Sequence, residues 1–134
     1  MQLSLRSGEK LYLNGALIKV DRKVSIELMN DVTFLLEAHV LTPENTTTPL
    51  RQLYFTIQVM LMDPSCKAEP QAEQMLDVLM QTFQNAEILK GLAQVRDLLA
   101  VKRRFEALKT IRKMYPIEAE IFAPERQRMT LPAA

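Results

Sequence analysis

The side chains that could carry out chemistry are few in this sequence, and they are not grouped. The single histidine, His39, stands at the end of a predicted strand, where a packed or surface histidine is far more common than a catalytic base. The single cysteine, Cys66, lies in a predicted loop with no histidine near it in sequence, which argues against a nucleophile. The three glycines form no phosphate-binding loop, and the acidic residues show no metal-ligand spacing. We therefore expect no enzyme, no metal site and no cofactor.

Positive charge is the remaining chemical signal, and its surplus is confined to one segment. Residues 86–116 carry eight Lys or Arg against three Asp or Glu, whereas the rest of the chain is slightly acidic. On a helix, Lys102, Lys109 and Lys113 share one face, flanked by Arg103 and Arg112. Such clusters supply the sequence-independent part of nucleic-acid affinity, so this face is a candidate phosphate-contacting patch. The alternative is an ordinary solvated helix face with Lys–Glu pairs.

The element with the clearest start and stop signals is a helix over residues 49–62. Thr48-Pro49 provides a capping hydroxyl and a first-turn proline, and Asp63-Pro64 ends the periodic stretch. A first apolar stripe is predicted to be core: Leu50, Leu53, Tyr54, Ile57, Met60 and Leu61. A second stripe, Phe55, Val59 and Met62, lies almost opposite. Two apolar faces are typical of a helix between two layers or at a subunit contact, so the second stripe is either core or a partner interface.

Short strands are predicted before this helix and further helices after it. Over residues 1–42, alternating segments are separated by turn residues, with Asn14-Gly15 as a hairpin signal, which predicts an antiparallel meander, either a small barrel or a curled sheet. Residues 43–48 read as a linker. Residues 49–122 predict a bundle of about four helices, with Pro116 ending or kinking the last one, and residues 123–134 a loose tail. The predicted fold class is α+β, in one compact domain.

Length and composition are those of an ordinary globular protein. The chain has 134 residues, of which 48% are hydrophobic and 25% charged. No apolar run reaches the roughly 18–20 residues that cross a bilayer, and the N-terminus lacks the pattern of a signal peptide. One cysteine allows no internal disulfide. We expect a cytoplasmic protein without a membrane partner.

Three stretches of the sequence form an ordered set of motifs. They are Leu3-x-Leu5 with Gly8-Glu9 and Leu13-Asn14-Gly15-Ala16; Thr47-Thr48-Pro49 through Leu61-Met62-Asp63-Pro64; and Phe105-Glu106-Ala107-Leu108-Lys109 through Tyr115-Pro116-Ile117-Glu118. In this order they resemble the FlbT family of flagellar biosynthesis regulators. Together they cover the chain from about residue 3 to residue 121. One departure is Ala100-Val101-Lys102, where the family pattern leads us to expect a glycine.

The resemblance implies a post-transcriptional regulator of flagellin synthesis. Members of the family are understood to associate with the 5′ untranslated region of flagellin mRNA and to repress translation or promote decay. The family offers no agreed RNA-contacting residues to transfer. An alternative is a protein-interaction adaptor that acts through another flagellar regulatory protein. A homo-oligomer would be compatible with both functions.

The N-terminal strands also resemble, at the level of fold, a small β-rich carbon-storage regulator that binds messenger leaders. That likeness suggests a second cationic surface on strand ends and turns, with Arg22 and Lys23 as its main candidates. Tyr12 is the only aromatic residue of the first hairpin and is the candidate for stacking on unpaired bases. The alternative for Tyr12 is an ordinary strand tyrosine that covers the sheet edge.

Overall fold

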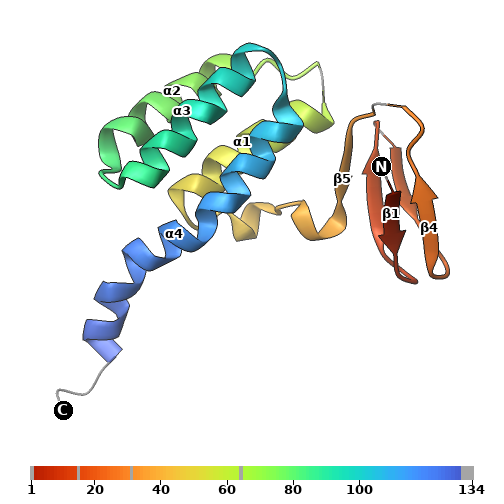
Figure 1. Cartoon of the computed structure of the whole chain (residues 1–134), viewed down its shortest axis with the longest axis horizontal. Helices are drawn as coiled ribbons and strands as arrows, with labels where there is room; N and C mark the ends of the chain where they lie inside the picture. Colours follow the sequence, from red (N-terminus) through yellow and green to blue (C-terminus); the bar gives the residue numbers. More distant parts are fainter. Residues whose placement is uncertain (1, 15, 31, 64, 131–134) are drawn as a thin grey trace.

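The computed structural model describes the backbone of residues 2–14, 16–30, 32–63 and 65–130, and side chains as far as Ala123. Within these residues, five short strands are followed by four α-helices (Figure 1). The strands gather at one end of the molecule, and the last helix projects away at the other. The predicted α+β class is therefore confirmed. Within the described residues, no helix is both long and apolar enough to cross a bilayer.

The strands form two small antiparallel sheets. One contains β1 (Gln2–Leu5) and β4 (Val24–Glu27), and the other has the order β3 (Ala16–Lys19), β2 (Lys10–Leu13), β5 (Phe34–Leu36). The predicted meander is wrong, because β1 pairs with β4 instead of β2, and within the described residues the strands close no barrel. The hairpin predicted at Asn14-Gly15 is confirmed for β2 and β3, although Gly15 itself lies outside the described residues.

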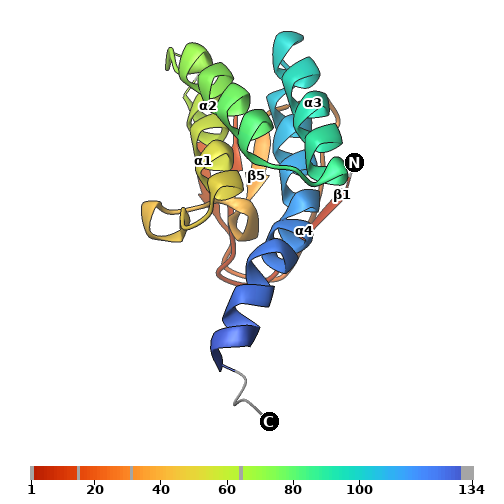
Figure 2. The same cartoon turned by 90° about the vertical axis from the view of Figure 1, so that its left-hand side faces the viewer.

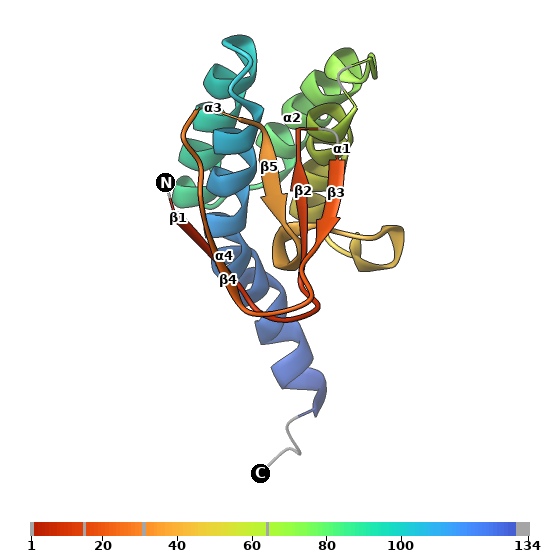
Figure 3. The same ribbon diagram turned by 90° about the vertical axis from the view of Figure 1, so that its right-hand side faces the viewer.

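The two sheets are successive halves of one long ribbon. Leu5 pairs with Val24, and Lys10 pairs with Lys19. Each pair is separated from the other by five positions in both segments, so the register is the same in the two sheets. Between the halves the chain bends at Gly8, which has a φ of +85° and donates a 2.8 Å hydrogen bond to the Val20 carbonyl. Figure 3 shows the bend below both ladders. The turn-forming residues that predicted chain reversals therefore bend a paired ribbon instead.

The four α-helices of the described residues form the larger part of the molecule, preceded by 3₁₀ turns at Glu37–His39 and Pro43–Asn45. They are α1 (Pro49–Met62), α2 (Glu69–Thr82), α3 (Ala86–Ala100) and α4 (Arg104–Thr130). Helix α1 packs against α2 and α4, and α3 packs against the same two helices (Figure 2). Thr48 caps α1 as predicted, because its hydroxyl accepts a hydrogen bond from the Arg51 N–H.

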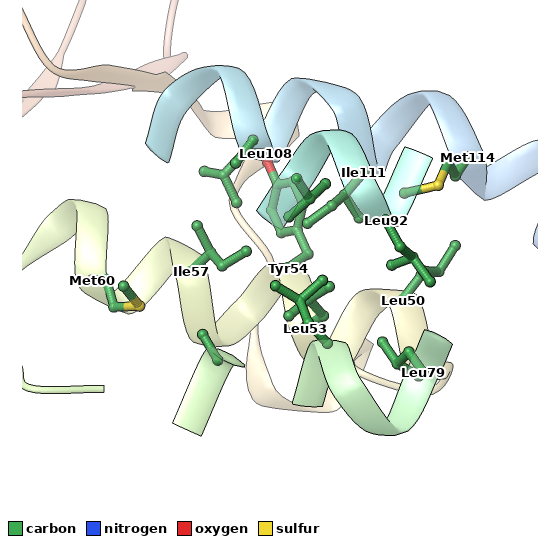
Figure 4. Packing of buried hydrophobic residues seen from close by; sticks show 14 of the residues in the cluster. Leu50, Leu53, Tyr54, Ile57, Met60, Leu79, Leu92, Leu108, Ile111 and Met114 are labelled. Atoms are coloured by element: carbon green, nitrogen blue, oxygen red, sulfur yellow. The ribbon is translucent and has the colours of Figure 1, made fainter. Parts of the chain in front are cut away.

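The first apolar stripe of α1 is the centre of the main core. All six predicted residues are buried, and Leu53, Ile57 and Leu50 have no exposed surface. Around them lie Leu79 of α2, Leu92 of α3, and Leu108, Ile111 and Met114 of α4 (Figure 4). Burying leucine or isoleucine contributes about 1.5–3 kcal/mol per side chain. The prediction of a core helix is confirmed.

Helix α4 continues through Pro116, where the sequence predicted either an end or a kink. Pro116 has no N–H to donate to the Arg112 carbonyl, yet the helix runs through it to Thr130. Ile111, Met114 and Glu118 on either side of the proline are buried against the bundle, and this packing offsets the lost hydrogen bond. Residues 123–130 are therefore helical where a loose tail was predicted, and residues 131–134 lie outside the described residues.

A buried carboxylate joins α4 to the start of α1. Glu118 is 1% exposed, and its Oε2 accepts a 2.9 Å hydrogen bond from the Leu50 N–H. A negative charge is favourable there, because the free N–H groups of a helix N-terminus carry partial positive charge. Thr48 and Glu118 thus satisfy two of the first N–H groups of α1.

Candidate nucleic-acid interface

The turn between α3 and α4 places Lys102 at an exposed position. The Lys102 N–H donates to the Leu99 carbonyl at 3.0 Å, and the Arg103 N–H donates to the Leu98 carbonyl at 2.8 Å. This pair of bonds is a Schellman motif, whose C′ residue takes the left-handed conformation and is usually glycine. Here the residue is Lys102, with a φ of +62°. The turn thus has the geometry that glycine favours, with a lysine in glycine's place.

A groove of about 260 Å³ opens beside this turn. It lies where the segment before β5, the end of α1 and the start of α4 meet. Its lining is apolar at Val32, Leu61 and Phe105, and Thr33 contributes a hydroxyl. The charged residues of the lining are Lys102, Arg103, Arg104 and Glu106. The groove therefore combines an apolar interior with three cations and one carboxylate.

The cations of the groove differ in mobility. Arg103 pairs with Glu106 one turn away, and both side chains are well exposed, so the pair contributes little and exchanges easily. Arg104 is 19% exposed; it donates to Glu69 at 2.5 Å and to the Met60 carbonyl at 3.4 Å. Arg104 is a fixed charge, whereas Lys102 and Arg103 extend into solvent.

Further along α4, the predicted cationic face is only partly present. Lys109 and Lys113 are exposed. Arg112 is half-buried and turns inward, where its Nη1 donates to the Tyr54 hydroxyl at 2.9 Å. That hydroxyl in turn donates to the His39 carbonyl at 2.5 Å. Arg112 therefore connects α4, α1 and the Glu37–His39 turn.

The second cationic set lies at the bend of the ribbon. Arg22 and Lys23 are exposed, and Arg22 pairs with Asp21 at 3.3 Å. Figures 1 and 3 place this bend well away from the α3–α4 turn. The structure therefore does not bring the two predicted cationic sets together.

Comparison with known proteins identifies the family. The sequence profile described as "Flagellar protein FlbT" matches residues 1–122. This chain belongs to the FlbT family. A FlbT relative from Chelativorans sp., named "Probable flagellum biosynthesis repressor protein FlbT", is 56% identical over 129 residues, covering 95% of this chain and 89% of the relative. Relatives of the same name from Brucella anthropi and Brucella ovis are each 54% identical over 127 residues, covering 93% of this chain and 84% of each relative. No solved structure matches this FlbT chain.

Tyr12 is held inside the FlbT fold. Its hydroxyl donates a 2.7 Å hydrogen bond to the Met62 carbonyl at the end of α1, and its half-buried ring packs against the main core. The side chain thereby fixes the β2–β3–β5 sheet on α1. This contact favours the structural alternative for Tyr12 over a stacking platform.

The second apolar stripe of α1 lies between core and surface. Phe55, Val59 and Met62 are each half-buried, and none belongs to the buried core of the described residues. Within this FlbT chain the stripe is therefore neither filled core nor fully exposed surface.

The remaining chemical candidates have ordinary surroundings. His39 is half-buried, and desolvation together with the nearby Arg112 charge lowers the pKa of its imidazole. Cys66 is a half-buried free thiol. The described residues hold no group of three or more His, Cys, Asp or Glu side chains arranged to bind a metal ion.

Sequence reasoning missed the walls of the groove. Val32, Thr33 and Phe105 line it, and none of the three is a candidate site residue in the sequence. Of the lining residues, the sequence predicted Lys102 and Arg103 as RNA-binding and Leu61 as core. The departure from the expected glycine within Ala100-Val101-Lys102 was the signal in the sequence that pointed to this turn.

Proposed function

We propose that this chain is a post-transcriptional repressor of flagellum biosynthesis that binds the 5′ untranslated region of flagellin mRNA. In this proposal it acts in the cytoplasm, without catalysis, by repressing translation or promoting decay of the message. The regulatory part is supported by the curated FlbT relatives, which carry the name flagellum biosynthesis repressor. The RNA-binding part is supported by exposed cations at the α3–α4 turn and along α4.

The observation that carries the RNA proposal is the left-handed Lys102 in an exposed turn. Together with Arg103, Lys109 and Lys113 it supplies exposed positive charge on a continuous stretch of sequence. Cations of this kind bind phosphates independently of base sequence, and each phosphate contact to a single strand contributes about 0.7 to the salt slope. Sequence recognition must then come from contacts with bases.

Binding to a fluorescent flagellin leader RNA tests the proposal. The variant Lys102→Glu/Lys109→Glu/Lys113→Glu is expected to lose affinity and to show a smaller salt slope. Arg22→Glu/Lys23→Glu tests the second cationic surface separately. Lys90→Glu, at an exposed lysine on α3, is the matched control. Failure of the unmodified chain to retain RNA at low salt would overturn direct binding.

The half-buried stripe of Phe55, Val59 and Met62 favours a second candidate function, an adaptor that controls flagellin expression through another flagellar regulatory protein. Phe55→Ser/Met62→Ser should then disrupt a complex recovered from cells while the circular dichroism spectrum stays unchanged. An unfolded variant would instead assign the stripe to the core and remove the main support for the adaptor.

A further inference from the structure

The groove beside the α3–α4 turn has the chemistry of a site for one nucleotide. Its volume of about 260 Å³ suits a planar ring that enters edge-first between walls from three elements. Val32, Leu61 and Phe105 offer apolar contact, and the Thr33 hydroxyl can both donate and accept a hydrogen bond. Unpaired bases are bound by this combination of apolar or aromatic contact with a few polar groups.

The aromatic wall is held rigidly. The ring of Phe105 packs against Phe34 with centroids 4.8 Å apart and planes tilted by 41°. Phe34 is buried in the small core of the β part, so Phe105 has little freedom to turn away. A fixed ring is a better surface for a base than a mobile one, because no side-chain entropy is lost on binding.

The charges lie where a phosphate of the same nucleotide would be. Lys102 and Arg103 are exposed, whereas Arg104 stays paired with Glu69 and adds a fixed positive charge to the lining. A phosphate on Arg103 would replace Glu106 as its partner, at small cost because that ion pair is solvated. The larger hollow, about 500 Å³ beside Phe83, Ile121 and Phe122, has no cation among its described lining residues and lacks this feature.

We propose that this groove holds one unstacked base of single-stranded RNA, with the adjoining phosphate on Lys102 and Arg103. The inference rests on the proposed RNA function and adds a location and a chemical class to it. It also gives a reason for a lysine at a left-handed position, because glycine there would have no side chain to contact the phosphate. Double-stranded RNA would not enter, since its bases are stacked and paired.

The test measures leader RNA binding with single abasic positions introduced along the strand. One abasic position is expected to weaken binding to the unmodified chain by about tenfold, the scale of one lost base contact. In Val32→Trp, which fills the groove, the same abasic position should have no further effect. Val78→Trp, at a 53% exposed position on α2, is the matched control. If the abasic position weakens RNA binding by the same factor in Val32→Trp as in the unmodified chain, the proposal is overturned.

Two further measurements separate the groove from the general function. Lys102→Gly removes the charge and favours the turn, so it provides a test even if Val32→Trp fails to fold. Unchanged RNA affinity in Lys102→Gly would count against binding of the nucleotide in the groove. Uridine monophosphate titrated into labelled protein should shift the resonances of Phe105 and Thr33. If no groove variant changes leader binding, base binding in the groove is overturned and the proposed function still stands. If uridine monophosphate shifts the Phe105 and Thr33 resonances but the chain does not bind leader RNA, nucleotide binding in the groove is supported and the proposed function is overturned.

Discussion

Arg112 and Tyr54 meet between α4 and α1, where the guanidinium Nη1 donates a 2.9 Å hydrogen bond to the phenol oxygen. The phenol O–H donates a hydrogen bond to the His39 carbonyl at 2.5 Å, so three segments meet at one hydroxyl. Burial raises the pKa of Tyr54, even though Arg112 acts in the opposite direction. An arginine predicted from charge spacing to face RNA is therefore part of the internal support of the bundle.

Replacing Arg112 should affect stability more than RNA affinity. Arg112→Leu leaves the Tyr54 hydroxyl without its donor, and we expect the free energy of unfolding to fall by about 1–3 kcal/mol, measured by urea denaturation. Lys109→Leu, at an exposed position of the same helix, should change it by no more than about 0.5 kcal/mol. A stable Arg112→Leu protein that has lost RNA affinity would reverse this assignment.

His39 should make the protein less stable in mild acid. Its folded-state pKa lies below the usual histidine value of 6.5 because of burial and the nearby Arg112. Below that value the unfolded chain binds a proton that the folded chain does not, so stability is present above pH 6.5 and falls as pH decreases. Urea denaturation between pH 7.5 and about 5.5 measures the change. His39→Gln should remove most of the slope in this window, and an unchanged slope would point to other groups.

Gly91 allows α3 and α4 to pack closely. A Cβ added at Gly91 would overlap the buried Met114 sulfur. Gly91→Ala gains about 1 kcal/mol of helix propensity, but overpacking costs about 1–3 kcal/mol, so we expect a small net loss of stability. In a Met114→Ala background the same change should become stabilising. The double-mutant cycle compares the change in the free energy of unfolding caused by Gly91→Ala in the two backgrounds. Equal changes would show that Met114 does not restrict the side chain at position 91.

Lys102→Gly separates folding from binding at a single position. A non-glycine residue in the left-handed region costs about 1–2 kcal/mol, so the glycine variant should melt at a higher temperature, in differential scanning calorimetry, than the unmodified chain. Its affinity for leader RNA should fall. Lys102→Ala, which removes the charge and keeps the strain, is the control for the thermal measurement. A glycine variant that melts no higher than the alanine variant would show that the strain is negligible.

Local signals predicted the local structure of this chain. The start of α1 at Thr48-Pro49 and its buried face followed from capping chemistry and periodicity, and Asn14-Gly15 marked the hairpin tip. The bent ribbon did not follow, because Gly8 and the Asp21–Lys23 segment have the same residue types whether the chain reverses or bends. Only the pairing of β1 with β4 distinguishes these outcomes.

The candidate site was predicted less completely for a related reason. Charge spacing placed Lys102, Arg103, Lys109 and Lys113 correctly on the surface. It could not show that Arg112 has a partner 58 residues earlier, or that Tyr12 has one 50 residues later. The groove is assembled from Val32, Leu61 and Phe105, which are far apart in sequence and carry no shared motif.

The hydrogen bond from Leu50 to Glu118 spans 68 positions, and this distance sets an order of events on the ribosome. Helix α1 is synthesised long before the residue that completes its N-terminus, and the Phe105 wall of the groove also arrives late. We expect a nascent chain to keep the part of α1 that packs on α4 uncovered until most of α4 has left the exit tunnel. Under the proposed function, a partly synthesised chain would then be unable to bind its message.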